Sequence, residues 1–176
     1  MYPGRSWPLA VIFLTTGACA RDPLEATCPM LSPGDLAVSE IRGKQSSSSD
    51  TIGPWVEIFN TSGAQVQLTG LTVSMTNLTG TTTTHDQVRD VAAVVLTGGY
   101  FVIDLTNAPP SGGGLDLVAC GTVIDHVVYR SLPGTGTLGY DGNKTPDATA
   151  NDNESAWCVD TTPAGTPQQR NHPCTQ

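Results

Sequence analysis

Basic residues are scarce in this chain, which has 8 Lys and Arg against 16 Asp and Glu and a formal net charge of -8 at pH 7. A protein that clamps nucleic acid needs clustered Lys and Arg to neutralise phosphates, and the few basic side chains here are scattered. The same scarcity excludes electrostatic attachment to an anionic membrane surface. We therefore expect no nucleic-acid partner, and no contact with a membrane that depends on surface charge.

Long hydrophobic runs are missing as well. The apolar run at 9–14 is far shorter than the roughly 20 residues that cross a bilayer as a helix, and no later segment is long enough. With Arg5 before the run and small residues after it, this segment has the layout of a signal peptide. The sequence LTTGAC at 14–19 resembles a bacterial lipobox. It predicts a signal peptide at 1–18 with lipid attachment at Cys19, and the alternative is a cut after Ala20 in a secreted protein.

The five cysteines contain no CxxC pair, and no His lies at metal-ligand spacing from them, which argues against a zinc site. Either cut leaves four of them in the folded part. An even number in an exported chain predicts two disulfides. Four cysteines allow three connectivities. Because domain ends often lie close together, we prefer Cys28 with Cys174, which leaves Cys120 with Cys158.

Catalytic signatures are also missing, since the chain has no HExxH, G-x-S-x-G or G-x-x-x-x-G-K motif. Glu40 and Glu57 lie in predicted strands and could form a catalytic carboxylate pair. We prefer carboxylates that accept hydrogen bonds from the backbone or from Arg42. Adjacent strand residues face opposite sides, so Asp125 does not orient His126, and we expect that histidine to be half-exposed. The sequence thus predicts no catalytic residue and no cofactor.

One acidic stretch, 141–154, suggests a weak calcium loop, because oxygen ligands alternate between Asp141 and Asp147. Lys144 interrupts the pattern, and the twelfth position holds Asp152 where a calcium loop has a bidentate Glu. A solvated turn is the preferred interpretation, and we assign no metal ligand.

The body of the chain alternates short β-branched and aromatic runs with clusters of Gly, Pro, Asn, Asp and Ser, and no segment has a helical period. In the run at 55–60, Val56 and Ile58 point to the core. This pattern favours an all-β, antiparallel sandwich of seven or eight strands in one domain. We place the strands at 35–41, 55–60, 66–68, 71–75, 100–105, 115–119, 123–130 and near 155–159. The Thr run at 81–84 is predicted to be a loop.

Several runs, in this order, resemble the lamin tail domain of bacterial exported proteins. They are GDLAVSEI at 34–41, WVEIFN at 55–60, VQLTG at 66–70, GGYFVI at 98–103, LDL at 115–117, VIDHVVY at 123–129 and Trp157. The resemblance implies an immunoglobulin-like β-sandwich over 34–171, after an exported linker at 19–33 and before a tail at 172–176. It also implies scaffolding or interaction roles without enzyme activity.

Three functional hypotheses follow. The first is a non-catalytic lamin-tail-like interaction or structural module, exported as a cell-surface or outer-membrane lipoprotein or as a secreted or periplasmic protein. Its unknown protein or surface-polymer partner would contact the loops at 43–54 and 134–153. The second is a carbohydrate or surface-polymer binding module that stacks its ligand on Trp55 or Tyr140. The third is a hydrolase, which requires clustered carboxylates beside a His in a deep pocket. Membrane contact is expected only through the lipid at Cys19.

Overall fold

The computed structural model describes residues 28–81 and 83–175, and these fold as eleven strands and two short 3₁₀ turns. The signal peptide predicted at 1–18 and the lipid attachment at Cys19 lie outside the described residues. No helix in the described ranges is long and apolar enough to span a membrane. The strands are β1 (Leu36–Arg42), β2 (Trp55–Asn60), β3 (Val66–Gln67), β4 (Thr72–Asn77), β5 (Thr83–Gln87), β6 (Val94–Val95), β7 (Tyr100–Asp104), β8 (Gly113–Ala119), β9 (Thr122–Tyr129), β10 (Thr137–Tyr140) and β11 (Trp157–Asp160).

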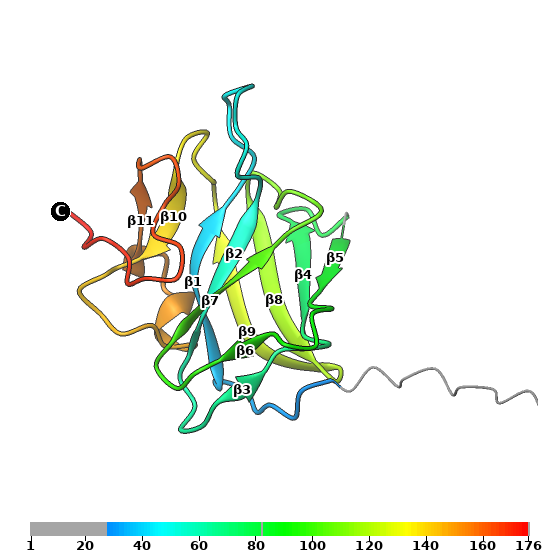
Figure 1. The fold of residues 1–176 in the computed structure, drawn as a ribbon. Coiled ribbons are helices and arrows are strands. Elements are labelled where there is room, and N and C mark those ends of the chain that lie inside the picture. Colours follow the sequence, from blue (N-terminus) through cyan, green and yellow to red (C-terminus); the bar gives the residue numbers. More distant parts are fainter. Residues whose placement is uncertain (1–27, 82, 176) are drawn as a thin grey trace, which may run out of the picture.

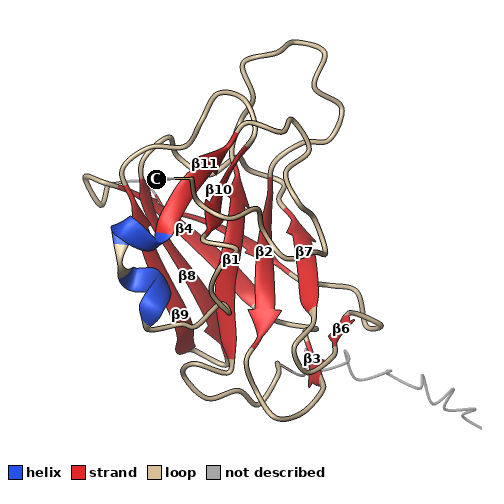
Figure 2. Cartoon of the chain, turned by 90° about the vertical axis from the view of Figure 1, so that its left-hand side faces the viewer, coloured by secondary structure: helices blue, strands red, loops and turns tan. Residues whose placement is uncertain are grey.

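The strands form two main antiparallel sheets that pack against each other (Figure 1). One sheet has the order β11-β10-β1-β2-β7, the other β5-β4-β8-β9, and β3 pairs with β6 in a small third sheet. The turns η1 (Ala150–Asp152) and η2 (Glu154–Ala156) lie at the edge of the sandwich, beside β9 and β11 (Figure 2). The prediction of an all-β antiparallel sandwich is confirmed.

The core is built from side chains of both main sheets. Val56 and Ile58 of β2 are fully buried in it, as predicted, together with Leu115 and Leu117 of β8. The opposite face of β2 is buried as well, which the alternating pattern did not indicate. Residues near the C-terminus cross the outer face of the five-stranded sheet and cover part of this second face of β2.

All eight predicted strands exist, with ends that differ by at most two residues from those predicted. Three further strands were not predicted. The Thr run expected to be a loop contributes Thr83 and Thr84 to β5, where they pair with β4. β6 has only two residues, and β10 lies inside the stretch 134–153 that we expected to be a loop.

Two disulfides are present, and the preferred pairing is wrong. Cys28 is bonded to Cys120, and Cys158 to Cys174. Cys120 lies in the two-residue turn between β8 and β9. The first described residues, which include Cys28, run beside this turn. The turn has positive φ at both positions, 50° at Cys120 and 78° at Gly121, which is the twist that a tight hairpin requires. Two disulfides indicate an oxidising compartment outside the cytoplasm.

The end of the chain, residues 161–174, forms what we call the C-terminal strap, red in Figure 1. The strap leaves β11 at Asp160 and returns to the same strand through the bond between Cys174 and Cys158. Cys174 thus fixes the end of the chain to the sandwich. Between these two ends the strap is held against β1, β2 and β10 by hydrogen bonds to side chains.

Candidate functional site

Two loops meet at one end of the sandwich, at the top of Figure 1, and we call them the apical rim. They are residues 43–54, between β1 and β2, and residues 131–136, between β9 and β10. The Ser46 N–H donates to the Gly134 carbonyl at 2.7 Å, and Gln45 exchanges two hydrogen bonds with the Gly136 backbone. A Cβ at Gly134 would lie 2.4 Å from Ser46 Oγ, so a side chain there would displace the Ser46 hydroxyl. The predicted loop 43–54 and the first residues of the predicted loop 134–153 therefore form one surface, whereas the rest of that stretch belongs to β10, η1 and the turns beside them.

Arg42, the last residue of β1, fixes the longer rim loop. Its guanidinium is bidentate to Asp50, at 2.7 and 3.1 Å, and also donates to the Gly53 and Pro163 carbonyls. This geometry is the planar fork that arginine offers to a carboxylate. The hydrogen bond from Arg42 holds the pKa of Asp50 below its usual range. Of the two donors expected for Glu40 and Glu57, the backbone or Arg42, the second is wrong, because the guanidinium bonds the rim loop and the strap instead.

We predict that Arg42→Met lowers the free energy of unfolding by about 3 kcal/mol, because it leaves the Asp50 carboxylate and the partly buried hydrogen bonds to the Gly53 and Pro163 carbonyls without their donor. Guanidinium chloride unfolding, followed by tryptophan fluorescence, measures the change. Lys44→Met on the same loop is the matched control, since Lys44 is exposed, and it should change stability by less than about 0.5 kcal/mol. Equal stability of both variants would refute the anchoring role of Arg42.

The rim encloses a hollow of about 350 Å³ beside the Arg42–Asp50 pair. Ile52, which is 49% exposed, is an apolar side chain at its edge. An open, hydroxyl-rich hollow with one exposed apolar side chain suits contact with a polar surface rather than enclosure of a small molecule. Its polar side chains include Ser47, Ser49, Asp50, Thr51 and Thr135.

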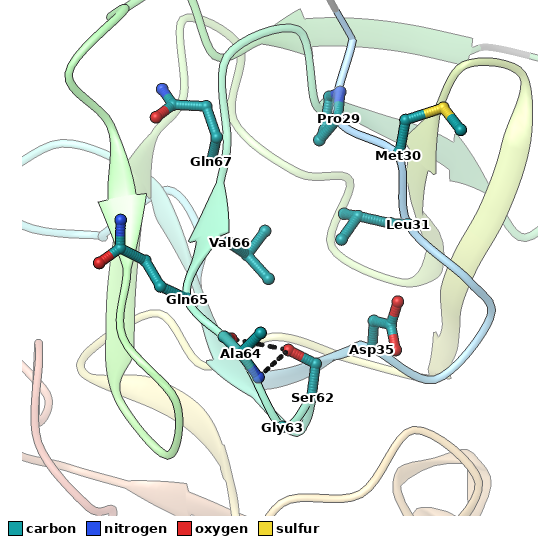
Figure 3. A pocket seen from close by; sticks show the side chains of 10 residues that line it. All are labelled: Pro29, Met30, Leu31, Asp35, Ser62, Gly63, Ala64, Gln65, Val66 and Gln67. Atoms are coloured by element: carbon teal, nitrogen blue, oxygen red, sulfur yellow. Dashed lines mark hydrogen bonds between the residues drawn. The ribbon is translucent and has the colours of Figure 1, made fainter.

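A second hollow, of about 350 Å³, lies at the opposite end of the sandwich, where the described chain begins (Figure 3). Leu31 and Val66 face each other across it, and Met30 beside it is 95% exposed. Pro29 is buried, and the Cys28–Cys120 bond fixes the segment to the β8–β9 turn. The described chain thus begins at the end of the sandwich opposite to the apical rim.

Glu40 and Glu57 form a carboxyl pair beneath the strap. They are direct partners in the pairing of β1 with β2, and both are fully buried. The Thr166 N–H and hydroxyl and the Thr137 hydroxyl donate to Glu40. Ser39 Oγ and the Gln168 N–H donate to Glu57. The sequence interpretation of these residues as acceptors of backbone hydrogen bonds is confirmed.

Burial governs the protonation of this pair. It raises the pKa of Glu57 to about 8, with a further contribution from the neighbouring Glu40, and it raises the pKa of Glu40 as well. The hydrogen-bond donors act in the opposite direction but do not outweigh burial. Within the described ranges neither carboxyl is in a salt bridge. At neutral pH Glu57 is therefore mainly protonated.

The remaining candidate residues do not lie together in one site. Trp55 and Tyr140 are each 2% exposed, so neither can stack on a sugar ring, and this corrects their assignment as binding platforms. His126 is half-exposed, as predicted, and bonds Asp116 on the adjacent strand. Asp125 is buried on the other side and accepts the Val38 N–H at 2.6 Å.

The carboxylate oxygens of Asp141 and Asp147 in the acidic stretch at 141–154 accept hydrogen bonds from nearby backbone N–H groups. Asp141 accepts the N–H groups of Asn143 and Cys174, and these bonds lower the pKa of its carboxyl. Asp147 accepts the N–H groups of Thr149 and Ala150. Among the described residues, no three His, Cys, Asp or Glu side chains come together as metal ligands. These contacts are those of polar turns.

No protein-family model, no curated protein and no solved structure matches this chain. The resemblance to lamin tail domains therefore stays a prediction. Of the candidate residues, the sequence indicated loop 43–54, residues 134–136 of the second rim loop and the carboxyl pair. It gave no signal that the strap covers that pair, because the contacts join residues more than a hundred positions apart.

Proposed function

We propose that this protein is a non-catalytic, exported interaction module with an immunoglobulin-like, lamin-tail-like sandwich, and that the apical rim contacts its partner. The partner is a protein or a polar polymer of the cell surface. The observation that carries the proposal is the joining of loops 43–54 and 131–136 into one rigid rim, fixed by Arg42 and by hydrogen bonds between the loops. Loops positioned in this way on a scaffold are the usual sites of recognition.

The position of Cys28, at the end of the sandwich opposite to the rim, supports the rim as the surface that contacts the partner. Cys19 lies nine residues before Cys28, a length that spans at most about 30 Å when extended. A lipid at Cys19 would hold the end shown in Figure 3 near the membrane and point the rim away from it. The module would thus present its loops outward from the cell envelope, as an outer-membrane or cell-surface lipoprotein.

The contacts of the carboxyl pair favour a structural role over the hydrolase alternative. Glu40 and Glu57 are clustered, as a hydrolase requires, but both are fully buried under the strap and occupied by its donors. A group that activates water must reach it. For the carbohydrate alternative, the rim offers hydroxyls and Ile52 but no exposed aromatic among its described lining residues.

Site-specific photo-crosslinking in the native cell tests the proposal. A photoreactive residue at Ile52 on the rim should give one or a few discrete high-mass adducts. The same residue at Val91, which is 81% exposed near the opposite end, serves as the matched control and should give none of them. Identical adduct patterns at both positions, or discrete adducts at Val91 alone, would refute recognition through the rim.

A further inference from the structure

The strap has an unusual attachment. Both of its ends are fixed to β11, one through the chain at Asp160 and the other through the Cys158–Cys174 disulfide. Its middle contacts the sheet through polar groups. The Thr166 N–H and Gln168 N–H donate to Glu40 and Glu57, and Asn171 donates to the Ser39 carbonyl at 2.7 Å. A loop fixed at its ends and held at its centre by hydrogen bonds can open without unfolding the sandwich.

The charges around the strap leave the carboxyl pair uncompensated. On β11, Asp160 adds negative charge beside Glu40 and is itself bonded to His172 of the strap at 2.7 Å. On β1, the guanidinium of Arg42 is directed at Asp50 and at carbonyls. On the far side, Tyr100 of β7 lies near Glu57 and near Arg170, whose side chain belongs to an exposed part of the strap.

We propose that the C-terminal strap is a pH-sensitive lid, which is closed while the Glu40–Glu57 pair carries a proton and opens when both carboxyls are ionised. In the closed state the pair carries one proton and accepts hydrogen bonds from the Ser39 and Thr137 hydroxyls. Loss of that proton places two negative charges on adjacent strands in a buried site. Lifting residues 164–170 hydrates both carboxylates and uncovers an acidic surface on β1 and β2, while the disulfide keeps the lid attached.

The opened lid would extend an existing hollow. A space of about 360 Å³ already borders the strap and is lined by Glu40, Asp160 and His172. With the strap raised, Glu57 would join that surface. The closed strap thus covers a surface with two carboxyl groups, and this surface stays covered at neutral and acidic pH.

Hydrogen–deuterium exchange of the full chain between pH 6 and pH 9 tests the lid. After correction for the intrinsic exchange rates, protection at Thr166 and Gln168 should fall by up to about tenfold per pH unit as the pair ionises. Protection at Leu117 in β8, which is fully buried, should stay constant and shows that the sandwich remains folded. The matched variant is Glu57→Gln, which keeps the shape of the protonated side chain and removes the charge.

In the Glu57→Gln protein, protection at Thr166 and Gln168 should be nearly independent of pH over the same range. Unchanged protection of these amides in the native chain would overturn the proposal. An equal loss in the native chain and in Glu57→Gln, or a parallel loss at Leu117, would also overturn it, because the opening would then not arise from this carboxyl pair. Each result can be read whether or not the apical rim binds a partner.

Discussion

Replacing the Cys28–Cys120 bond, as Cys28→Ser with Cys120→Asn, should lower the free energy of unfolding by about 4.6 kcal/mol. The bond closes a loop with a sequence separation of 92 residues, and the entropy it removes from the unfolded chain grows with loop length. Asn is chosen at position 120 because φ is 50° there, in the left-handed region that Asn tolerates. Guanidinium chloride unfolding under non-reducing conditions measures the loss.

The second disulfide gives the matched comparison. Cys158 and Cys174 are separated by 16 residues, so removing this pair as Cys158→Ser with Cys174→Ser should cost about 3 kcal/mol. The account requires the larger loss for the Cys28–Cys120 pair, which joins the start of the described chain to the β8–β9 turn. A larger loss for Cys158–Cys174 would mean that the strap supports the sandwich more than its start does.

The stability of the native protein should fall as the pH rises from about 5 to 9, by an amount on the order of 3 kcal/mol. Glu57 has a folded-state pKa of about 8, above the ordinary glutamate pKa of 4.5. A carboxyl whose pKa is raised by folding contributes its full stabilisation below the unfolded pKa, and loses it as the pH rises through the folded pKa. The loss should level off once the strap opens, because the carboxylate then ionises in water.

Glu57→Gln provides the control for this pH dependence. The amide oxygen of the variant can accept the Gln168 N–H, and its NH2 group can donate to Ser39 Oγ, which reverses the native hydrogen bond from Ser39 Oγ to Glu57. The variant should match the native protein within about 1 kcal/mol at pH 5 and exceed its stability at pH 9. Denaturant unfolding at the two pH values measures both differences. A variant that is less stable than the native protein at pH 9 would show that the ionised Glu57 is favourable in the fold.

The sequence predicted those strands whose side chains carry the local signal. Val56 and Ile58 alternate with polar or aromatic neighbours in a run free of Gly and Pro, and this run became β2 with the predicted bounds. β10 was missed because its four residues include Gly139 and follow a Gly-rich stretch. It forms because β1 and β11 pair with it on both sides. Tertiary pairing, rather than propensity, defines such a strand.

The candidate sites, like the strands, could be predicted from the sequence only in part. Glu40 and Glu57 drew attention as carboxylates within strands, where burial is costly unless partners are present. Their partners lie in the strap, at sequence separations of 126 and 111, so no local pattern could reveal them. The disulfide pairing was equally non-local, and the preference for joining the two ends of the domain failed because each end is fixed to a nearby strand or turn.

The mass of the intact protein from its native cell, before and after reduction, followed by mapping of disulfide-linked peptides, tests the central claim most directly. The account predicts a mature chain that starts at an acylated Cys19, gains four hydrogens on reduction and yields linked peptides for Cys28–Cys120 and Cys158–Cys174. An intact N-terminus at Met1 with all five cysteines as free thiols would contradict an exported, disulfide-braced module.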